Sequence, residues 1–129
     1  MAQLGEDKRQ IGLTPAGQTA LGVLMADERF AAETDAYKFG ISYAIAAGLD
    51  PDEAPTGGYI TKYNAIGGID IDGVIRDLID VLAVGDPGRP YAAAEKLAEL
   101  GITAVAKRLH GNESLADIMA DVSGQCHGL

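Results

Sequence analysis

Residues 9–49 read RQIGLTPAGQTALGVLMADERFAAETDAYKFGISYAIAAGL, and this stretch decides the fold. It opens on an alternating segment in which Ile11 and Leu13 share one side of an extended chain. The other side carries Lys8, Gln10 and Gly12. The alternation predicts a short strand over Arg9–Leu13, but a strand of that length is not stable alone. Its partner is either the same segment of a second subunit or, if the segment is an extended arm, the core of its own chain.

Two helices follow the strand. Thr14 and Pro15 form a typical helix start, with Thr14 as N-cap and proline at the first helical position. A second helix is predicted over residues 34–47, with Thr34 as cap and Gly48 as the left-handed stop. This helix is apolar on most of its surface, so it lies either at the centre of the monomer or in a subunit interface. The residues expected in an oligomer interface are Ile11, Leu13, Tyr37, Gly40, Ile41 and Ala44.

The rest of the chain predicts further helical packing. Helices are expected over residues 72–83, 90–101, 102–110 and 114–122, with a loose tail after them. The first of these has an apolar face of Ile71, Val74, Ile75, Leu78, Ile79 and Leu82 that predicts burial. Residues 54–70 are rich in turn residues, and the part around Tyr59–Tyr63 is either a short strand or an ordered loop. The predicted fold is mainly α, with about six helices and a short N-terminal strand. It forms one domain over residues 1–129, made of a unit at 8–49 and a helical lobe at 69–122.

Charge and composition restrict the partners. The formal net charge is −9 and the isoelectric point about 4.4, which opposes indiscriminate attraction to phosphate backbones or acidic lipids. Residues 1–49 carry four Lys/Arg against six Asp/Glu, and residues 50–129 carry six against thirteen. Any contact with nucleic acid is therefore expected in the first part. A single cysteine, the absence of an apolar leader and the absence of a run of about 20 apolar residues predict a soluble cytoplasmic protein without a membrane partner.

No motif of catalysis or metal binding stands out in the sequence. Asp70 and Asp72 alternate as in a calcium loop, but Val74 and Ile75 occupy the positions that would require an oxygen ligand and a glycine. An aspartate that caps the following helix explains this pattern better. Cys126 and His127 lack enough further ligands for a structural zinc site. We therefore expect a protein that is not an enzyme and has no cofactor.

A strand, a helix opened by Thr-Pro, a turn and the helix TDAYKFGISYAIAAGL resemble the ribbon-helix-helix fold over residues 8–49. In that family two chains pair their strands, outward strand side chains read the DNA major groove, and the N-terminus of the second helix holds a phosphate. The resemblance implies that the strand pairs across a dimer. By position, the outward strand residues that it implies are Lys8, Gln10 and Gly12. The residues expected to bind DNA are Lys8, Arg9, Gln10 and Lys38.

The layout of the longer chain is similar to the small DndE subunits of bacterial DNA phosphorothioation and related phage-defence clusters. The similarity lies in the ribbon-helix-helix-like start, a TKYN segment, the helix IDGVIRDLIDVL and the pair AAAEKLAELG and ITAVAKRL. It implies an oligomeric, non-enzymatic accessory subunit of a DNA-modification or phage-defence system that acts through DNA, a larger protein, or both. The alternative is an acidic helical adaptor that binds only protein partners. Its sequence feature is the excess of seven acidic residues after residue 49.

Overall fold

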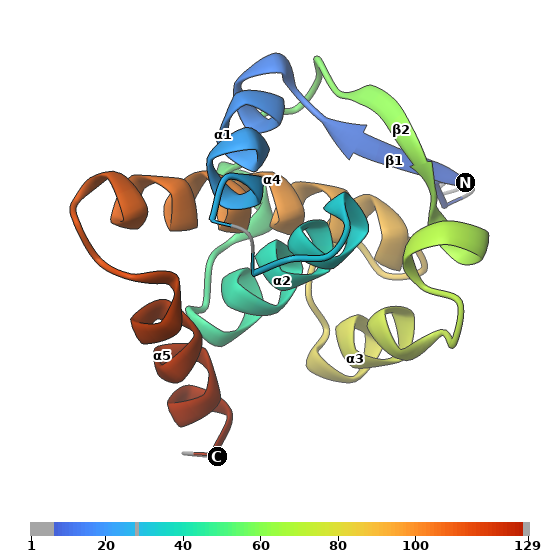
Figure 1. The fold of residues 1–129 in the computed structure, drawn as a ribbon. Helices are drawn as coiled ribbons and strands as arrows, with labels where there is room; N and C mark the ends of the chain where they lie inside the picture. Colours follow the sequence, from blue (N-terminus) through green and yellow to red (C-terminus); the bar gives the residue numbers. More distant parts are fainter. Residues whose placement is uncertain (1–6, 28, 128–129) are drawn as a thin grey trace.

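Helix α4 (Pro90–His110) runs through the middle of the molecule, and the other elements pack around it (Figure 1). The computed structural model describes residues 7–27 and 29–127, with side chains up to Val122. The remaining elements are β1 (Gln10–Leu13), α1 (Pro15–Met25), α2 (Glu33–Ala46), a 3-10 turn (Pro51–Glu53), β2 (Ile60–Asn64), a π-helical turn (Ala65–Ile69), α3 (Val74–Leu82) and α5 (Leu115–His127). A mainly α fold with a short N-terminal strand is confirmed. No helix in the part of the chain described here is long and apolar enough to span a bilayer.

Helix α4 is continuous where two helices were predicted. Gly101 was expected to end the first of them, but it lies inside α4 at the point where α2 crosses. A Cβ atom at Gly101 would lie 1.8 Å from the carbonyl oxygen of Gly40, so this crossing requires glycine. A helix-interior glycine costs about 1 kcal/mol relative to alanine. The close packing of the two backbones offsets that cost. The local sequence around Gly101 does not reveal this packing and therefore looks like a helix stop.

Strand β1 finds its partner in its own chain. It pairs antiparallel with β2, from Gln10 opposite Asn64 to Leu13 opposite Ile60, with an irregularity between Ile11 and Gly12. The region that was left open between strand and loop is therefore a strand. The prediction that β1 pairs across a dimer is wrong in this structure, because one edge of β1 is occupied by β2 and the other faces side chains of α4.

Carboxylates of α4 cover that second edge. The Gly12 N–H donates to Glu95 Oε2 at 2.8 Å, and the Thr14 N–H donates to Glu99 Oε1 at 3.0 Å. The Thr14 hydroxyl also donates to Glu99 Oε2 at 2.7 Å. Backbone donors that would otherwise be free to pair with another strand are thereby satisfied within the chain.

The six residues predicted for an oligomer interface lie in the core of the single chain, so that prediction is corrected. All of them are buried, and they pack with residues of α1 and α4: Ile11, Leu13, Tyr37, Gly40, Ile41 and Ala44. The Tyr37 hydroxyl donates to the Gly12 carbonyl at 2.9 Å. The Tyr37 ring lies edge-on to the Tyr63 ring, with 4.8 Å between the ring centroids. These contacts hold α2 against the sheet. The apolar surface of α2 is therefore explained by its position at the centre of the monomer, which was the alternative prediction.

Several helix ends follow local signals. Thr14 caps α1 by accepting the Gly17 N–H at 3.1 Å, and Gly48 ends α2 in the left-handed region at φ 69°. Helix α2 begins at Glu33, one residue earlier than predicted, with Ala32 at the N-cap and no side-chain cap. The tail predicted to be loose continues α5 to His127.

Candidate functional site

The four residues predicted to bind DNA are not gathered into one basic patch. Lys8 forms an ion pair with the buried carboxylate of Glu95, and its ammonium lies 5.5 Å from the centre of the Tyr59 ring. Arg9, directly before β1, and Gln10, the first residue of β1, are exposed. Lys38 is half-buried on α2, where it lines a groove next to α3.

The N-terminus of α2, which holds a phosphate in ribbon-helix-helix proteins, carries Glu33 here. Its carboxylate pairs with Lys62 Nζ at 2.6 Å and accepts the Tyr63 hydroxyl at 2.9 Å. The hydrogen bond from Lys62 is the main cause of the lowered pKa of Glu33. The negative charge of Glu33 therefore occupies the end of α2 that an anion would approach.

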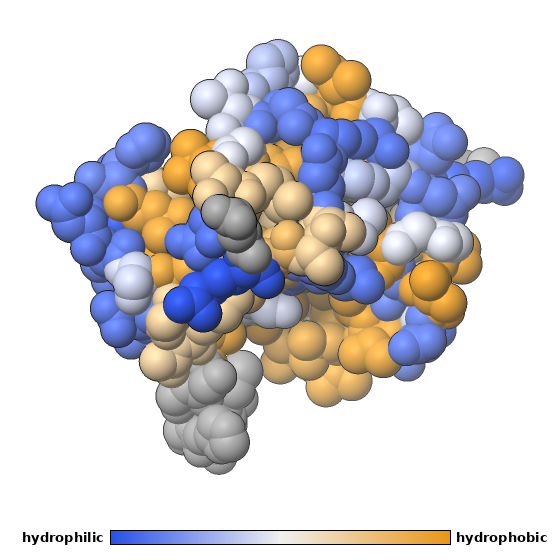
Figure 2. Space-filling view, viewed as in Figure 1, coloured by the Kyte–Doolittle hydropathy of each residue, from blue (hydrophilic) through white to orange (hydrophobic). Residues whose placement is uncertain are grey.

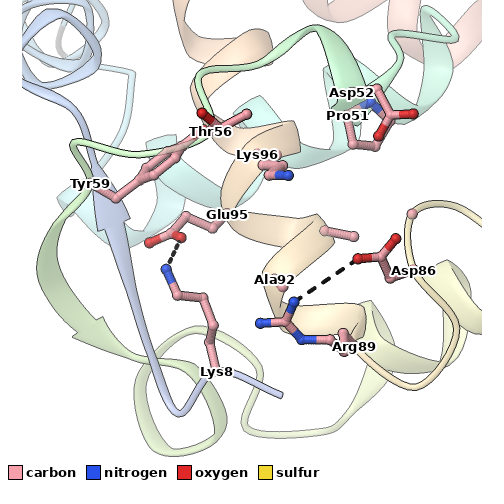
Figure 3. A pocket seen from close by; sticks show the side chains of 12 residues that line it. Lys8, Pro51, Asp52, Thr56, Tyr59, Asp86, Arg89, Ala92, Glu95 and Lys96 are labelled. Carbon is pink, nitrogen blue, oxygen red and sulfur yellow. Dashed lines mark hydrogen bonds and ion pairs between the residues drawn. The ribbon is translucent and has the colours of Figure 1, made fainter. Parts of the chain in front are cut away.

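A polar cavity of about 160 Å³ lies between the sheet and the start of α4 (Figure 3). Its charged lining consists of Lys8, Arg89, Lys96, Asp52, Asp86 and Glu95. Lys8 pairs with Glu95, and Arg89 lies 4.0 Å from Asp86. Since equal numbers of acids and bases line the cavity, it offers no net attraction for an anion.

The hydroxyl of Tyr59, at the wall of that cavity, is buried and has no hydrogen-bond partner among the described residues. Burial, together with the nearby carboxylates of Glu99 and Glu95, raises the pKa of this phenol. It is therefore a neutral hydroxyl at physiological pH.

The carboxylates of Glu95 and Glu99 were missed by sequence reasoning. Both are buried, 3% and 4% exposed, although charged residues on a helix of an acidic protein are ordinarily solvated. Their spacing of four residues within an alanine-rich helix was the available signal, since it places both on one face. Glu95 contacts β1 and Glu99 contacts Thr14, the residue that follows it, so both have a structural role.

Helix α3 exposes most of its apolar residues. Ile79 is buried and Ile75 half-buried, as predicted, but Val81 is 81%, Val74 62% and Ile71 71% exposed. We call the exposed set the α3 face: Ile71, Val74, Leu78, Val81 and Leu82. The prediction that Ile71, Val74, Leu78 and Leu82 are buried is therefore wrong. Figure 2 shows apolar surface gathered over α3, at the lower right of the molecule.

Helical geometry explains the division. At about 100° per residue, Ile75 and Ile79 lie on one edge of a wide apolar arc, while Val74, Leu78, Val81 and Leu82 lie on the remainder. Only the first edge packs against the core, and α3 contacts α4. The apolar periodicity of α3 is therefore real, but only part of the arc meets the core.

Asp70 anchors α3 to α4. Its carboxylate accepts the N–H groups of Ile75 and Arg76 at 2.9 and 3.0 Å, and the Tyr91 hydroxyl at 2.8 Å. This confirms the prediction that one of the two aspartates, Asp70 or Asp72, caps this helix, and the capping residue is Asp70. Burial opposes ionisation of the carboxyl, but the three hydrogen bonds outweigh it and lower the pKa of Asp70. The anchored start of α3 fixes the direction of the α3 face.

A groove of about 440 Å³ adjoins the α3 face. Lys38 and Ser42 of α2 form one wall, and Ile71, Val74 and neighbouring residues form the other. The groove also carries the exposed Asp72, so charges of both signs lie beside its apolar residues.

No cluster of three or more His, Cys, Asp or Glu side chains that could hold a metal occurs among the described residues. Cys126 and His127 were predicted not to form a structural zinc site, and their side chains lie outside the described part. Comparisons of the chain with protein-family models, with curated proteins and with solved structures gave no match.

Proposed function

We propose that this protein is a non-enzymatic subunit that acts by binding a larger protein through the α3 face. The observation that carries the proposal is the exposure of five large aliphatic residues on and beside one anchored helix. Single exposed aliphatic residues are ordinary, but contiguous apolar patches on a protein surface are typical of interaction sites.

The energetics fit a docking surface. Burying an exposed Val, Leu or Ile side chain stabilises a complex by roughly 1.5–3 kcal/mol before the cost of association. A helix that offers Val74, Leu78 and Val81 at three- and four-residue spacing matches the way amphipathic helices enter apolar grooves. Because Asp70 fixes the start of the helix, little conformational entropy is lost on binding.

Charge favours a protein partner over DNA. The chain carries a net charge of −9, and Lys8, one of the four residues predicted to bind DNA, is already paired with Glu95. The role in a DNA-modification or phage-defence system rests on the resemblance in layout and stays a prediction. A gel shift at low salt separates the two readings. A shift that disappears when Lys8, Arg9 and Lys38 are replaced would support DNA contact, and its absence supports protein partners alone.

The test of the proposal uses a photo-crosslinking amino acid in place of Val81 in the full chain, expressed in its own cells. The control carries the same amino acid in place of Thr103, which is exposed on α4. We expect one discrete adduct with another protein from position 81 and none from position 103. The captured protein is then purified and bound again. The same adduct from both positions, or none from position 81, would contradict the proposal.

A further inference from the structure

We infer that the polar cavity beside the start of α4 binds a small free amino acid, whose carboxylate pairs with Lys96 and whose ammonium pairs with Asp52. The inference goes beyond the proposed function, because the residues of the α3 face do not line this cavity. The two sites therefore stand or fall separately.

The cavity is built from segments that lie far apart in the sequence (Figure 3). Lys8 precedes β1, Asp52 belongs to the 3-10 turn, Tyr59 precedes β2, Asp86 lies in the loop before α4, and Lys96 lies on α4. A concave space on which polar groups from separate elements converge is typical of small-molecule sites.

The size of the cavity limits the ligand. Its volume of about 160 Å³ is well below the roughly 300 Å³ at which sites for drug-sized molecules begin. It corresponds to about five water molecules at roughly 30 Å³ each. The cavity therefore has room for a small amino acid and not for a nucleotide.

Two charged side chains at the cavity are unpaired within the part of the chain that the structure describes. Lys8 pairs with Glu95. The ammonium of Lys96, which is half-exposed, and the carboxylate of Asp52, which is exposed, form no hydrogen bond or ion pair with the described residues. One cation and one anion thus remain available to a ligand.

This charge pattern favours a zwitterion over a simple ion. An anion that pairs with Lys96 would also meet the acidic side chains of the wall, and a cation that pairs with Asp52 would also meet the basic ones. A zwitterion satisfies both unpaired groups at once. Among small zwitterions, an amino acid carries a primary ammonium that donates hydrogen bonds to a carboxylate, whereas a quaternary ammonium donates none.

The Tyr59 hydroxyl gives separate support for a polar occupant. It is buried at the cavity wall without a hydrogen-bond partner among the described residues. Buried donors without a partner are uncommon in folded proteins. A polar molecule in the cavity would supply the missing acceptor, and an apolar one would not.

Three related probes test the inference on the full chain: alanine, propionate, which lacks the ammonium, and ethylamine, which lacks the carboxylate. Amide chemical shifts in NMR titrations report both affinity and place. We expect alanine to shift the amides of residues that line the cavity, such as Ala92, Ala93 and Lys96, and to bind at least about tenfold more tightly than either other probe. Absence of these shifts at millimolar alanine, or equal binding of all three probes, would overturn the inference.

Variants assign the two charges. We expect Lys96→Met and Asp52→Asn each to weaken alanine binding about fivefold or more, while Asp52→Asn does not weaken propionate. The controls Lys107→Met and Glu53→Gln make the same changes of charge at exposed positions outside the cavity, and we expect them to alter alanine binding less than about twofold. Equal losses in variants and controls would mean that only overall charge is sensed, which would also overturn the inference.

Discussion

Asp70 connects the start of α3 with α4 through one carboxylate, which accepts two backbone N–H groups and the Tyr91 hydroxyl. Burial and, as the smaller cause, the hydrogen bond that the Tyr91 hydroxyl donates to Asp70 raise the pKa of Tyr91 to about 12. The phenol thus remains a donor throughout the physiological range. This small network sets the position of the α3 face.

Replacing Asp70 by Ala is expected to lower the free energy of unfolding by about 1–3 kcal/mol, because a helix cap is lost and a buried hydroxyl loses its acceptor. Urea unfolding at neutral pH measures the loss. The control is Asp72→Ala, where the carboxylate is exposed, and we expect a change within about 0.5 kcal/mol there. Equal losses at both positions would contradict the capping role.

The lowered pKa of Asp70 predicts a pH dependence. Because the carboxyl has a lower pKa in the folded chain than in the unfolded chain, its stabilising effect is complete above the unfolded-state pKa and is lost as the pH falls through the folded-state pKa. The difference in unfolding free energy between the natural chain and Asp70→Asn should therefore shrink in acid. A difference that stays constant through that range would exclude this linkage.

Two glycines inside helices should respond in opposite ways to alanine. At Gly101 the added Cβ would meet the Gly40 backbone at 1.8 Å, so Gly101→Ala is expected to cost about 3 kcal/mol or more. At Gly22 in α1 no atom beyond the adjoining residues and the backbone of the helix itself lies within 4 Å of the added Cβ, so Gly22→Ala should stabilise by up to about 1 kcal/mol. Thermal unfolding distinguishes them. A harmless Gly101→Ala would show that α2 and α4 do not approach this closely.

At the scale of elements, β1 is held by β2 on one edge and by α4 on the other. Glu99→Met leaves the Thr14 N–H and hydroxyl without their acceptor, and we expect a loss of about 2–4 kcal/mol. Amide hydrogen exchange should quicken at Thr14. Lys96→Met, on the same helix but half-exposed, serves as control with an expected change within about 0.5 kcal/mol. Unchanged exchange at Thr14 would contradict the anchoring by Glu99 of Thr14, the residue that follows β1.

Elements that depend on local sequence signals were predictable. Alternation at Ile11 and Leu13, the cap at Thr14 and the stop at Gly48 are local signals, and each predicted its element correctly. The partner of β1 was not predictable in this way. Strand β2 lies about 50 residues further along the chain, and a glutamate such as Glu99 on a helix is ordinarily expected to face solvent. Pairing within the chain and pairing across a dimer leave the same alternation.

The candidate site illustrates a second limit. Periodicity identified the apolar side of α3, but it does not say how much of that side the fold covers. Ile75 and Ile79 pack against the core, and the rest of the arc stays exposed. The pattern therefore identified four residues of the α3 face, Ile71, Val74, Leu78 and Leu82, but predicted that they are buried, and it did not include Val81.

At the scale of the whole molecule, the core and the α3 face should separate stability from binding. Ile79 is 1% exposed, so Ile79→Ala is expected to cost about 2–4 kcal/mol of unfolding free energy. Val74→Ser with Val81→Ser removes only exposed apolar groups, and we expect a change within about 1 kcal/mol. Urea unfolding of both variants checks this. A large loss in the double valine variant would mean that the α3 face supports the fold itself.

The most direct test of the account measures the affinity of the partner captured at position 81, once purified, for the natural chain and for Val74→Ser with Val81→Ser. We expect a loss of affinity of about thirtyfold or more, from two aliphatic contacts of roughly 1 kcal/mol or more each, with stability nearly unchanged. An unchanged affinity in a folded double variant would contradict it.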